Sequence, residues 1–98
     1  MDEIQANYEA LEQIAQKFSS TAEEVAQSYK LITDRMQTLQ GTWKGRGSKA
    51  FFAEMGEEVL PALGRLHEAL NEAGRSTAQI AQTLNQAEEE ASGLFRPR

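Results

Sequence analysis

The sequence predicts an all-α protein, an antiparallel hairpin of two long helices that joins a second hairpin in a four-helix bundle. Three observations support this class. No glycine or proline occurs before Gly41, three glycines then fall between Gly41 and Gly47, and an apolar heptad repeat runs on both sides of them. With 98 residues there is room for one domain. We therefore expect residues 1–98 to form a single helical-hairpin domain.

The first helix is expected over about residues 3–40. Uncharged, mostly apolar residues recur there in alternating steps of four and three, which is the spacing of one continuous helix face. The positions are Ile4, Tyr8, Leu11, Ala15, Phe18, Ala22, Val25, Tyr29, Ile32, Met36 and Leu39. A new helix could begin at either of two capping-box patterns, Ser20–Glu23 and Ser76–Gln79. Because the repeat passes through both without losing phase, we predict that both helices are continuous.

The turn is expected over residues 41–47. Gly41 suits the position just after a helix, where a left-handed conformation ends the helix at low cost. Ser48 is the best candidate for the N-cap of the second helix. The segment between them is too short for anything but an antiparallel reversal.

The second helix is expected over about residues 48–91, with a bend near Pro61, which cannot bond to the Glu57 carbonyl. Gly93 is expected to end it, leaving a flexible tail over 92–98. Two interpretations of Leu94-Phe95 stay open there, a frayed end and a short docking peptide. The heptad positions of this helix are Phe52, Gly56, Val59, Leu63, Leu66, Leu70, Ala73, Thr77, Ile80, Leu84, Ala87 and Ala91.

A two-helix hairpin encloses no interior. The residues that flank the apolar heptad positions of each helix, which we call its seam, therefore stay exposed to solvent. Burying apolar surface stabilises the folded state by roughly 25 cal/mol per Å², whereas the lost conformational entropy costs about 1.5 kcal/mol for each ordered residue. A single hairpin is therefore expected to be only marginally stable. Several apolar residues also widen the stripes beyond one partner helix, namely Ile14, Leu31, Phe51, Met55 and Leu60. We therefore expect a second hairpin to complete the core as a four-helix bundle.

Composition excludes several classes of function. The chain has 10 Lys+Arg against 15 Asp+Glu, a net charge of −5, which argues against nucleic acid. It has no cysteine, and its single histidine, His67, has no acid three or four residues away, so no metal site is expected. Glu88, Glu89 and Glu90 are consecutive on a helix and cannot converge on a cation. Neither a catalytic cluster nor a phosphate loop is present, so we expect no enzyme and no cofactor.

No cleavable signal or membrane span is expected. The chain opens Met1-Asp2-Glu3, which is acidic where a signal peptide is basic, and no apolar stretch approaches the roughly 18 residues of a span. Action on membranes through exposed amphipathic helices is one possible function, but the acidic net charge disfavours it. Stable membrane insertion is therefore not expected.

The only tryptophan, Trp43, lies in the turn, two residues before Gly45. An indole there either plugs the end of the hairpin or is an anchor presented to another protein. A chain of about this length, with Trp43-Lys44-Gly45 between two heptad-patterned helices, resembles the WXG-hundred family, the ESAT-six-like substrates of type VII (ESX) secretion. The resemblance covers essentially the whole chain, and it makes Trp43 and Gly45 the motif and recognition residues.

The resemblance implies a small dimeric substrate or export partner of a type VII system, made in the cytoplasm and secreted folded without a signal peptide. It implies a partner hairpin, either a second copy or a related W-x-G protein, and an FtsK-like ATPase. Many family members carry a Tyr-x-x-x-Asp/Glu export signal around the end of helix 2, but this chain has only Tyr8 and Tyr29. Its nearest counterpart is a degenerate signal, Leu84 with Glu88. The alternative is a cytosolic helical-bundle adaptor with no export role.

Overall fold

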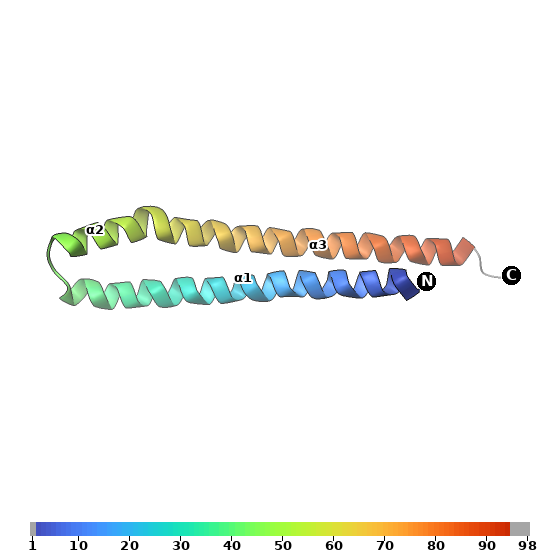
Figure 1. Cartoon of the computed structure of the whole chain (residues 1–98), viewed down its shortest axis with the longest axis horizontal. Helices are drawn as coiled ribbons and strands as arrows, with labels where there is room; N and C mark the ends of the chain where they lie inside the picture. The colour runs from blue at the N-terminus through green and yellow to red at the C-terminus, as the bar shows by residue number, and fades with distance from the viewer. Residues whose placement is uncertain (1, 95–98) are drawn as a thin grey trace. The chain divides into compact units, whose positions relative to one another are not determined.

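A computed structural model describes residues 2–94 of the chain, with the side chains of residues 5–93 (Figure 1). Nearly all of these residues are helical, and no β-strand occurs among them. The elements follow in the order α1 (Asp2–Thr42), α2 (Arg46–Glu54), the π-helical turn η1 (Met55–Val59) and α3 (Leu60–Leu94). The predicted all-α class, with two long helical segments joined by a short connection, is confirmed.

Both capping-box patterns lie inside unbroken helices, so the prediction of continuous helices is confirmed at these two places. The Ser20 hydroxyl, which would be the cap of the first pattern, donates to the Gln16 carbonyl at 2.8 Å. A hydroxyl that bonds one turn back along its own helix is not capping a new one.

The helix ends differ from three expectations. Gly41 lies within α1, which ends at Thr42, so the prediction that Gly41 follows the helix is wrong. Gly93 lies within α3, which continues to Leu94, so the prediction that Gly93 ends the helix is also wrong. The tail predicted over 92–98 is helical as far as Leu94. Its remaining residues, with Phe95 of the docking peptide, lie outside the described part of the chain.

The distortion expected near Pro61 is a π-helical turn on its N-terminal side, visible as a wide turn of ribbon in Figure 1. The Leu60 N–H bonds to the Met55 carbonyl, five residues back instead of four. Proline has no N–H for the Glu57 carbonyl, and its ring would clash with that carbonyl in a regular α-helix. The widened turn accommodates both effects.

The chain divides into two compact units. One, which we call the terminal unit, comprises Met1–Ser20 and Asn71–Arg98; the other, the turn unit, comprises Thr21–Leu70. Each contains a stretch of α1 and a stretch of α3 running in opposite directions (Figure 1). The single hairpin domain over residues 1–98 stays a prediction.

In the terminal unit, α1 and α3 approach closely because small residues meet there. Ala15 and Ala81 are 7% and 0% exposed. A Cβ added to Gly74 would lie 3.2 Å from Ser19 Oγ and 3.4 Å from the Ala15 carbonyl oxygen. The backbone of α3 at Gly74 therefore packs directly on α1, an approach that a larger side chain would prevent.

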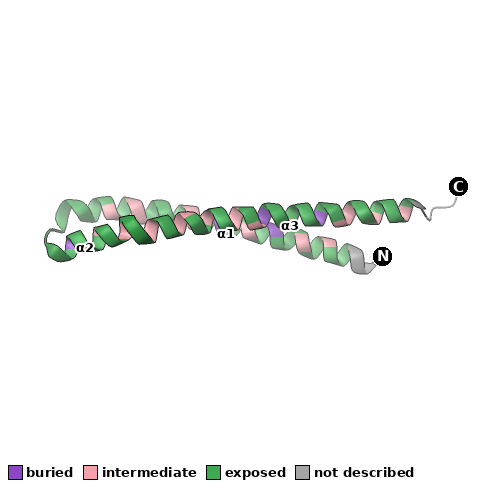
Figure 2. Cartoon of the chain, turned by 90° about the horizontal axis from the view of Figure 1, so that it is seen from above, coloured by how far each residue is buried: buried purple, intermediate pink, exposed green. Residues whose placement is uncertain are grey.

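The turn unit also buries few residues. Its buried residues are Ala22, which is 1% exposed, and Ser48, which is 6% exposed. The larger apolar side chains along its arms are half-buried or exposed. Figure 2 colours each residue by its burial, and most of the ribbon is pink or green. No large side chain of the described residues is fully buried.

The predicted inward positions of α3 form two sets, each with a spacing of seven residues, which we call columns. In one of the two columns, the residues that face inward are one position later than predicted. The column that shares Leu63, Leu70, Thr77 and Leu84 is half-buried as expected. In the other column Leu66 and Ile80 are 45% and 58% exposed, so their prediction as packing residues is wrong within this chain. The next residue in each case faces inward instead, which gives the column Leu60, His67, Gly74, Ala81 and Glu88.

On α1 the predicted seam agrees better with the structure. Of the α1 positions with described side chains, Ala15 and Ala22 are buried, and only Tyr29 and Leu39 are classed as exposed, each at 38%. Of the remaining predicted seam positions with described side chains, Gly56, Ala87 and Ala91 are exposed. The others are half-buried, namely Tyr8, Leu11, Phe18, Val25, Ile32, Met36, Phe52, Val59 and Ala73. Among the expected flanks, Ile14, Leu31 and Phe51 are exposed, whereas Met55 and Leu60 are half-buried.

Candidate recognition site at the W-x-G turn

The turn between α1 and α2 depends on the backbone of Gly45. The Trp43 N–H still bonds to the Leu39 carbonyl at 2.8 Å, which continues the α1 pattern one residue beyond Thr42. Gly45 then adopts φ 121° and ψ −176°, a region essentially reserved for glycine. An added Cβ would meet nothing within 4 Å. The requirement for glycine therefore comes from the backbone conformation and not from lack of space.

Ser48 ties the turn together in a way the sequence did not predict. Gly45 occupies the N-cap position of α2 and Ser48 is the third residue of the helix, so the prediction of Ser48 as N-cap is wrong. Its buried hydroxyl donates to the Trp43 carbonyl at 2.9 Å. This bond satisfies one of the carbonyls that the end of α1 leaves without a helical partner. The short spacing from Trp43 to Ser48 was the only sequence signal for it.

Trp43 belongs to a cluster of three aromatic rings. Its ring centroid lies 5.5 Å from that of Phe51 and 6.0 Å from that of Phe52, and the two phenylalanine rings meet edge-on at 5.2 Å. These are the distances and tilts that aromatic pairs favour. Trp43 and Phe51 nevertheless remain 37% and 36% exposed. The indole is thus packed on one side and open on another.

Three cations lie close to Trp43 in the sequence, namely Lys44, Arg46 and Lys49. None of them forms an ion pair with a carboxylate of the described residues. The Lys44 ammonium donates only to the Gln40 carbonyl, at 3.4 Å. A shallow groove here is lined by Gln40, Trp43, Lys44, Gly45, Ser48, Lys49 and Phe52. We call the three rings and three cations the turn surface; it can offer an apolar contact and unpaired positive charge to another protein.

A family model described as proteins of 100 residues with WXG matches residues 3–89, and Trp43-Lys44-Gly45 supplies its motif. The chain belongs to the WXG100 family. No curated protein and no solved structure matches it. Membership suggests a small protein secreted by an ESX-type system.

The two residues of the degenerate export signal in this WXG100 chain lie on α3 in the terminal unit. Leu84 and Glu88 are both half-buried, and Glu88 Oε2 is buried without a hydrogen-bond partner in the described part of the chain. Both residues face the seam more than solvent. Their role in export stays a prediction.

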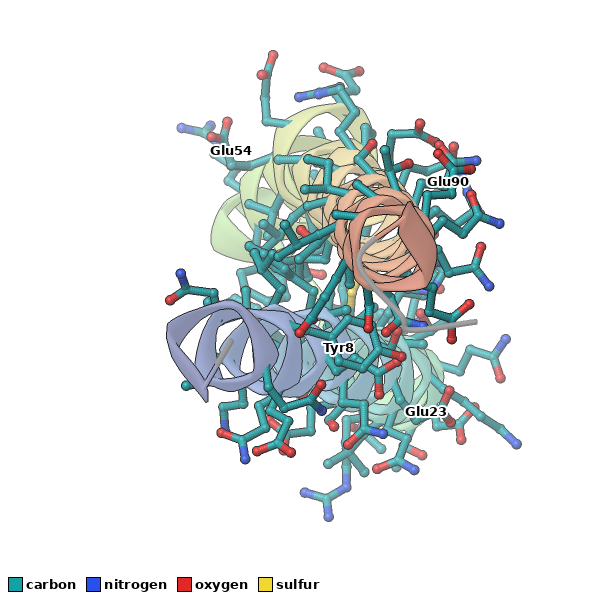
Figure 3. All side chains as sticks on the ribbon, turned by 90° about the vertical axis from the view of Figure 1, so that its right-hand side faces the viewer. Tyr8, Glu23, Glu54 and Glu90 are labelled. Atoms are coloured by element: carbon teal, nitrogen blue, oxygen red, sulfur yellow. The ribbon has the colours of Figure 1, made fainter. Side chains whose placement is uncertain are left out.

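Tyr8, one of the two tyrosines, has a partner in its own helix. Its hydroxyl donates to Glu12 Oε1 at 2.7 Å. This hydrogen bond, more than the partial burial or the charges of Glu12 and Glu89, raises the pKa of Tyr8 above its ordinary value of 10.0. Figure 3 looks at the terminal unit end-on and labels Tyr8, with the Glu90 carboxylate directed outward.

The described residues offer little for other chemistry. No group of three or more His, Asp or Glu among them could hold a metal ion, and His67 is half-buried on α3. None of the described helices is long and apolar enough to cross a bilayer.

Proposed function

We propose that this WXG100 chain is a substrate or export partner of a type VII, ESX-like secretion system and that it acts by protein–protein recognition. The observation that carries the proposal is the Trp43-Lys44-Gly45 motif at an exposed turn, in a chain whose residues 3–89 match the family. It is made in the cytoplasm and leaves the cell without a cleaved signal peptide, driven by an FtsK-like ATPase.

The turn surface supports recognition because it joins two features that interfaces favour. A partly exposed tryptophan is a frequent anchor of protein interfaces. The unpaired cations beside it would select a partner that offers carboxylates and would speed its association. In this proposal Trp43 is the anchor, and Gly45 gives the backbone the turn that presents it.

Pairing with a second hairpin is part of the same proposal. The buried apolar residues of the described chain are alanines, Ala15, Ala22 and Ala81, which is little core for a protein of this length. A four-helix bundle, made with a second copy or with a related W-x-G protein, would cover the half-buried seams. The chain would then be exported as a folded dimer.

The test is secretion from a host that carries the type VII system. The untagged chain should appear in the culture supernatant, should be absent from the supernatant of a strain that lacks the FtsK-like ATPase, and should have an uncleaved N-terminus by mass spectrometry. A cytosolic enzyme measured in both supernatants controls for lysis. Equal amounts in the two supernatants would contradict the proposal.

A cytosolic helical-bundle adaptor is the second candidate. It is favoured by one observation, the lack of a tyrosine after Tyr29, where a Tyr-x-x-x-Asp/Glu signal would need one near the end of α3. In that case the chain stays in the cell fraction of both strains. Co-expression with a W-x-G partner that bears the tyrosine signal separates this candidate from a substrate whose signal is supplied by its partner.

A further inference from the structure

The turn unit contains a hollow between α1 and α3. It has a volume of about 260 Å³ and is lined by Ala26, Tyr29, Leu63, Gly64, His67 and Glu68. Ala26 and Gly64 line it with little or no side chain, and a Cβ added to Gly64 would meet nothing within 4 Å. The hollow therefore exists because small residues from both helices stand where the helices do not close up.

The space beside Gly64 is unlike the space beside the other inward glycine of α3. At Gly74 an added Cβ would already lie 3.2 Å from Ser19 Oγ, whereas Gly64 is half-buried and still has open space beside it. Apolar walls that face an empty space forgo the dispersion contacts of a packed interior. A side chain that enters this hollow would supply contacts that the chain does not make for itself.

Glu68 gives the hollow a carboxylate that has no ion-pair partner in the described part of the chain. Arg65, three residues earlier, does not pair with it, although the same spacing joins Glu72 and Arg75 at 2.6 Å. Glu68 stands one helical turn after Gly64, and helical side chains lean toward the N-terminus of their helix. The carboxylate therefore leans toward the open space beside the glycine.

Tyr29 supplies an aromatic wall from the opposite helix and is 38% exposed. Ala26, Leu63 and Gly64 make the rest of the wall apolar. An aromatic ring attracts a cation to its face, and an apolar wall accepts the methylene stem of a long basic side chain. Together with the Glu68 carboxylate, these walls suit a group that has an apolar stem and a positively charged head.

Size and charge point to one basic side chain of another protein. The hollow is smaller than the ~300–1,000 Å³ of sites that hold a whole small molecule. Residues 21–40 and 51–70, the arms of the turn unit, carry seven acids and three cations, and this negative charge attracts a basic segment. Arginine fits better than lysine, because its planar guanidinium stacks on aromatic rings and pairs with a carboxylate through two hydrogen bonds.

We propose that this hollow, which we call the arginine site, binds one arginine side chain from a basic segment of a partner protein. The guanidinium lies between the Tyr29 ring and the Glu68 carboxylate, and the methylene stem packs over Gly64. The arginine site goes beyond the proposed function, which places recognition at the turn surface, and does not rest on it. Because the turn surface is positively charged and the arginine site is negatively charged, the two select different partners.

The first test is an NMR titration of the isotope-labelled full chain with the capped peptide acetyl-Gly-Gly-Arg-Gly-Gly-amide. The Gly64 amide and the Tyr29 ring protons should shift and saturate, with a dissociation constant of about 1 mM for this single anchoring side chain. The same peptide with citrulline, the neutral counterpart of arginine, should bind at least about ten-fold more weakly. The peptide with lysine should bind at least about three-fold more weakly.

Two variants separate the charge of the site from its shape. Glu68→Gln, which keeps the shape of the side chain, should weaken binding of the arginine peptide by at least about ten-fold. Gly64→Leu should abolish the saturable shift of the Tyr29 ring, because the new side chain fills the hollow. Glu54→Gln is the matched control, since it removes one exposed carboxylate of the turn unit that lies outside the hollow. Its dissociation constant should stay within about two-fold of the native value.

The contrary outcomes identify other occupants. Equal binding of the arginine and citrulline peptides would overturn a cation as the ligand, and equal binding of the lysine peptide would overturn the choice of arginine. Equal weakening by Glu68→Gln and Glu54→Gln would show a general attraction to an acidic chain and would overturn the site, as would the absence of a saturable shift up to about 10 mM peptide.

A second copy of the chain is the remaining alternative source of the arginine. The Gly64 amide should keep its position when the native chain is concentrated without peptide. A shift under these conditions that Arg46→Gln removes would overturn the assignment to another protein. None of these measurements involves secretion, so the arginine site and the proposed function can fail separately.

Discussion

The terminal unit and the turn unit use the same helices for different purposes. In the terminal unit the residues at the contact are small, and Gly74 brings the α3 backbone against Ala15 and Ser19. In the turn unit the side chains at the connection are large, and Trp43, Phe51 and Phe52 pack on one another while remaining partly open. One unit gains stability from close backbone approach, and the other leaves aromatic surface exposed.

This difference shows where each kind of substitution should act. A change in the terminal contact should lower stability through crowding, because the helices there have no room to give. A change in the turn should act through the backbone of Gly45 or through the exposed rings.

Two glycines ten residues apart on α3 give the sharpest test. Gly74→Leu should lower the free energy of unfolding by about 2–3 kcal/mol, because its Cβ would already crowd Ser19 and the side chain has nowhere to go. Gly64→Leu is the matched change in the turn unit, where an added Cβ meets nothing within 4 Å. It should be neutral or stabilising, since leucine favours the helix more than glycine does. Urea unfolding followed by circular dichroism measures both, and equal losses would contradict the contrast.

Within the turn, Gly45 and Gly47 separate backbone strain from crowding. Gly45→Ala should cost about 1–2 kcal/mol, because its φ of 121° is strained for any residue with a Cβ. Gly47→Ala should change stability by no more than about 0.5 kcal/mol, since its Cβ would make an ordinary 3.6 Å contact with Trp43. The shift in thermal midpoint of the two variants measures the difference. A larger loss for Gly47→Ala would show that ring packing, and not the backbone, determines the turn.

Replacing Glu88 should make the folded chain more stable. Its Oε2 is buried without a partner in the described chain, so Glu88→Leu should raise the free energy of unfolding by about 1 kcal/mol once that desolvation cost is removed. Glu90→Leu is the control, because it removes an exposed charge from the same end of α3. It should stay within about 0.5 kcal/mol of the native chain. Destabilisation by Glu88→Leu alone would show that the carboxylate has a favourable role.

The smallest effect concerns Tyr8. Because its pKa is raised in the folded chain, the neutral phenol favours folding below pH 10, and this contribution disappears as the pH rises through the folded pKa. Glu12→Gln should move the pKa back toward 10.0. Tyrosinate absorbance, titrated in a Tyr29→Phe background, measures the shift. An unchanged pKa would show that the Glu12 hydrogen bond is not its main cause.

The helices and the position of the turn could be predicted from the sequence because heptad spacing survives local exceptions. The seam of α3 could be predicted only in part. Leu66 and Ile80 are more apolar than His67 and Ala81, yet the second pair faces inward. Close helix approach at Gly74 favours a small residue one heptad later, at Ala81, by fit, which hydropathy along a sequence does not measure.

The turn shows a second limit. Ser48 and Gly41 matched the residue preferences of helix ends, but those preferences do not fix the backbone torsion that reverses the chain. Once Gly45 takes a positive φ, it becomes the N-cap of α2 and moves Ser48 into the helix. The hydroxyl of Ser48 then bonds to Trp43, a contact that depends on the three-dimensional turn.

In the proposed function Trp43 serves recognition more than folding. Secretion of Trp43→Ala from a host with the type VII system tests this role, with the thermal unfolding of the purified variant measured alongside. The partly exposed ring and the Ser48 bond to the Trp43 backbone carbonyl, which the substitution keeps, predict a helical variant that unfolds near the native midpoint. Its secreted fraction should fall at least about ten-fold. Native secretion by the variant, or its unfolding at the growth temperature, would contradict the claim.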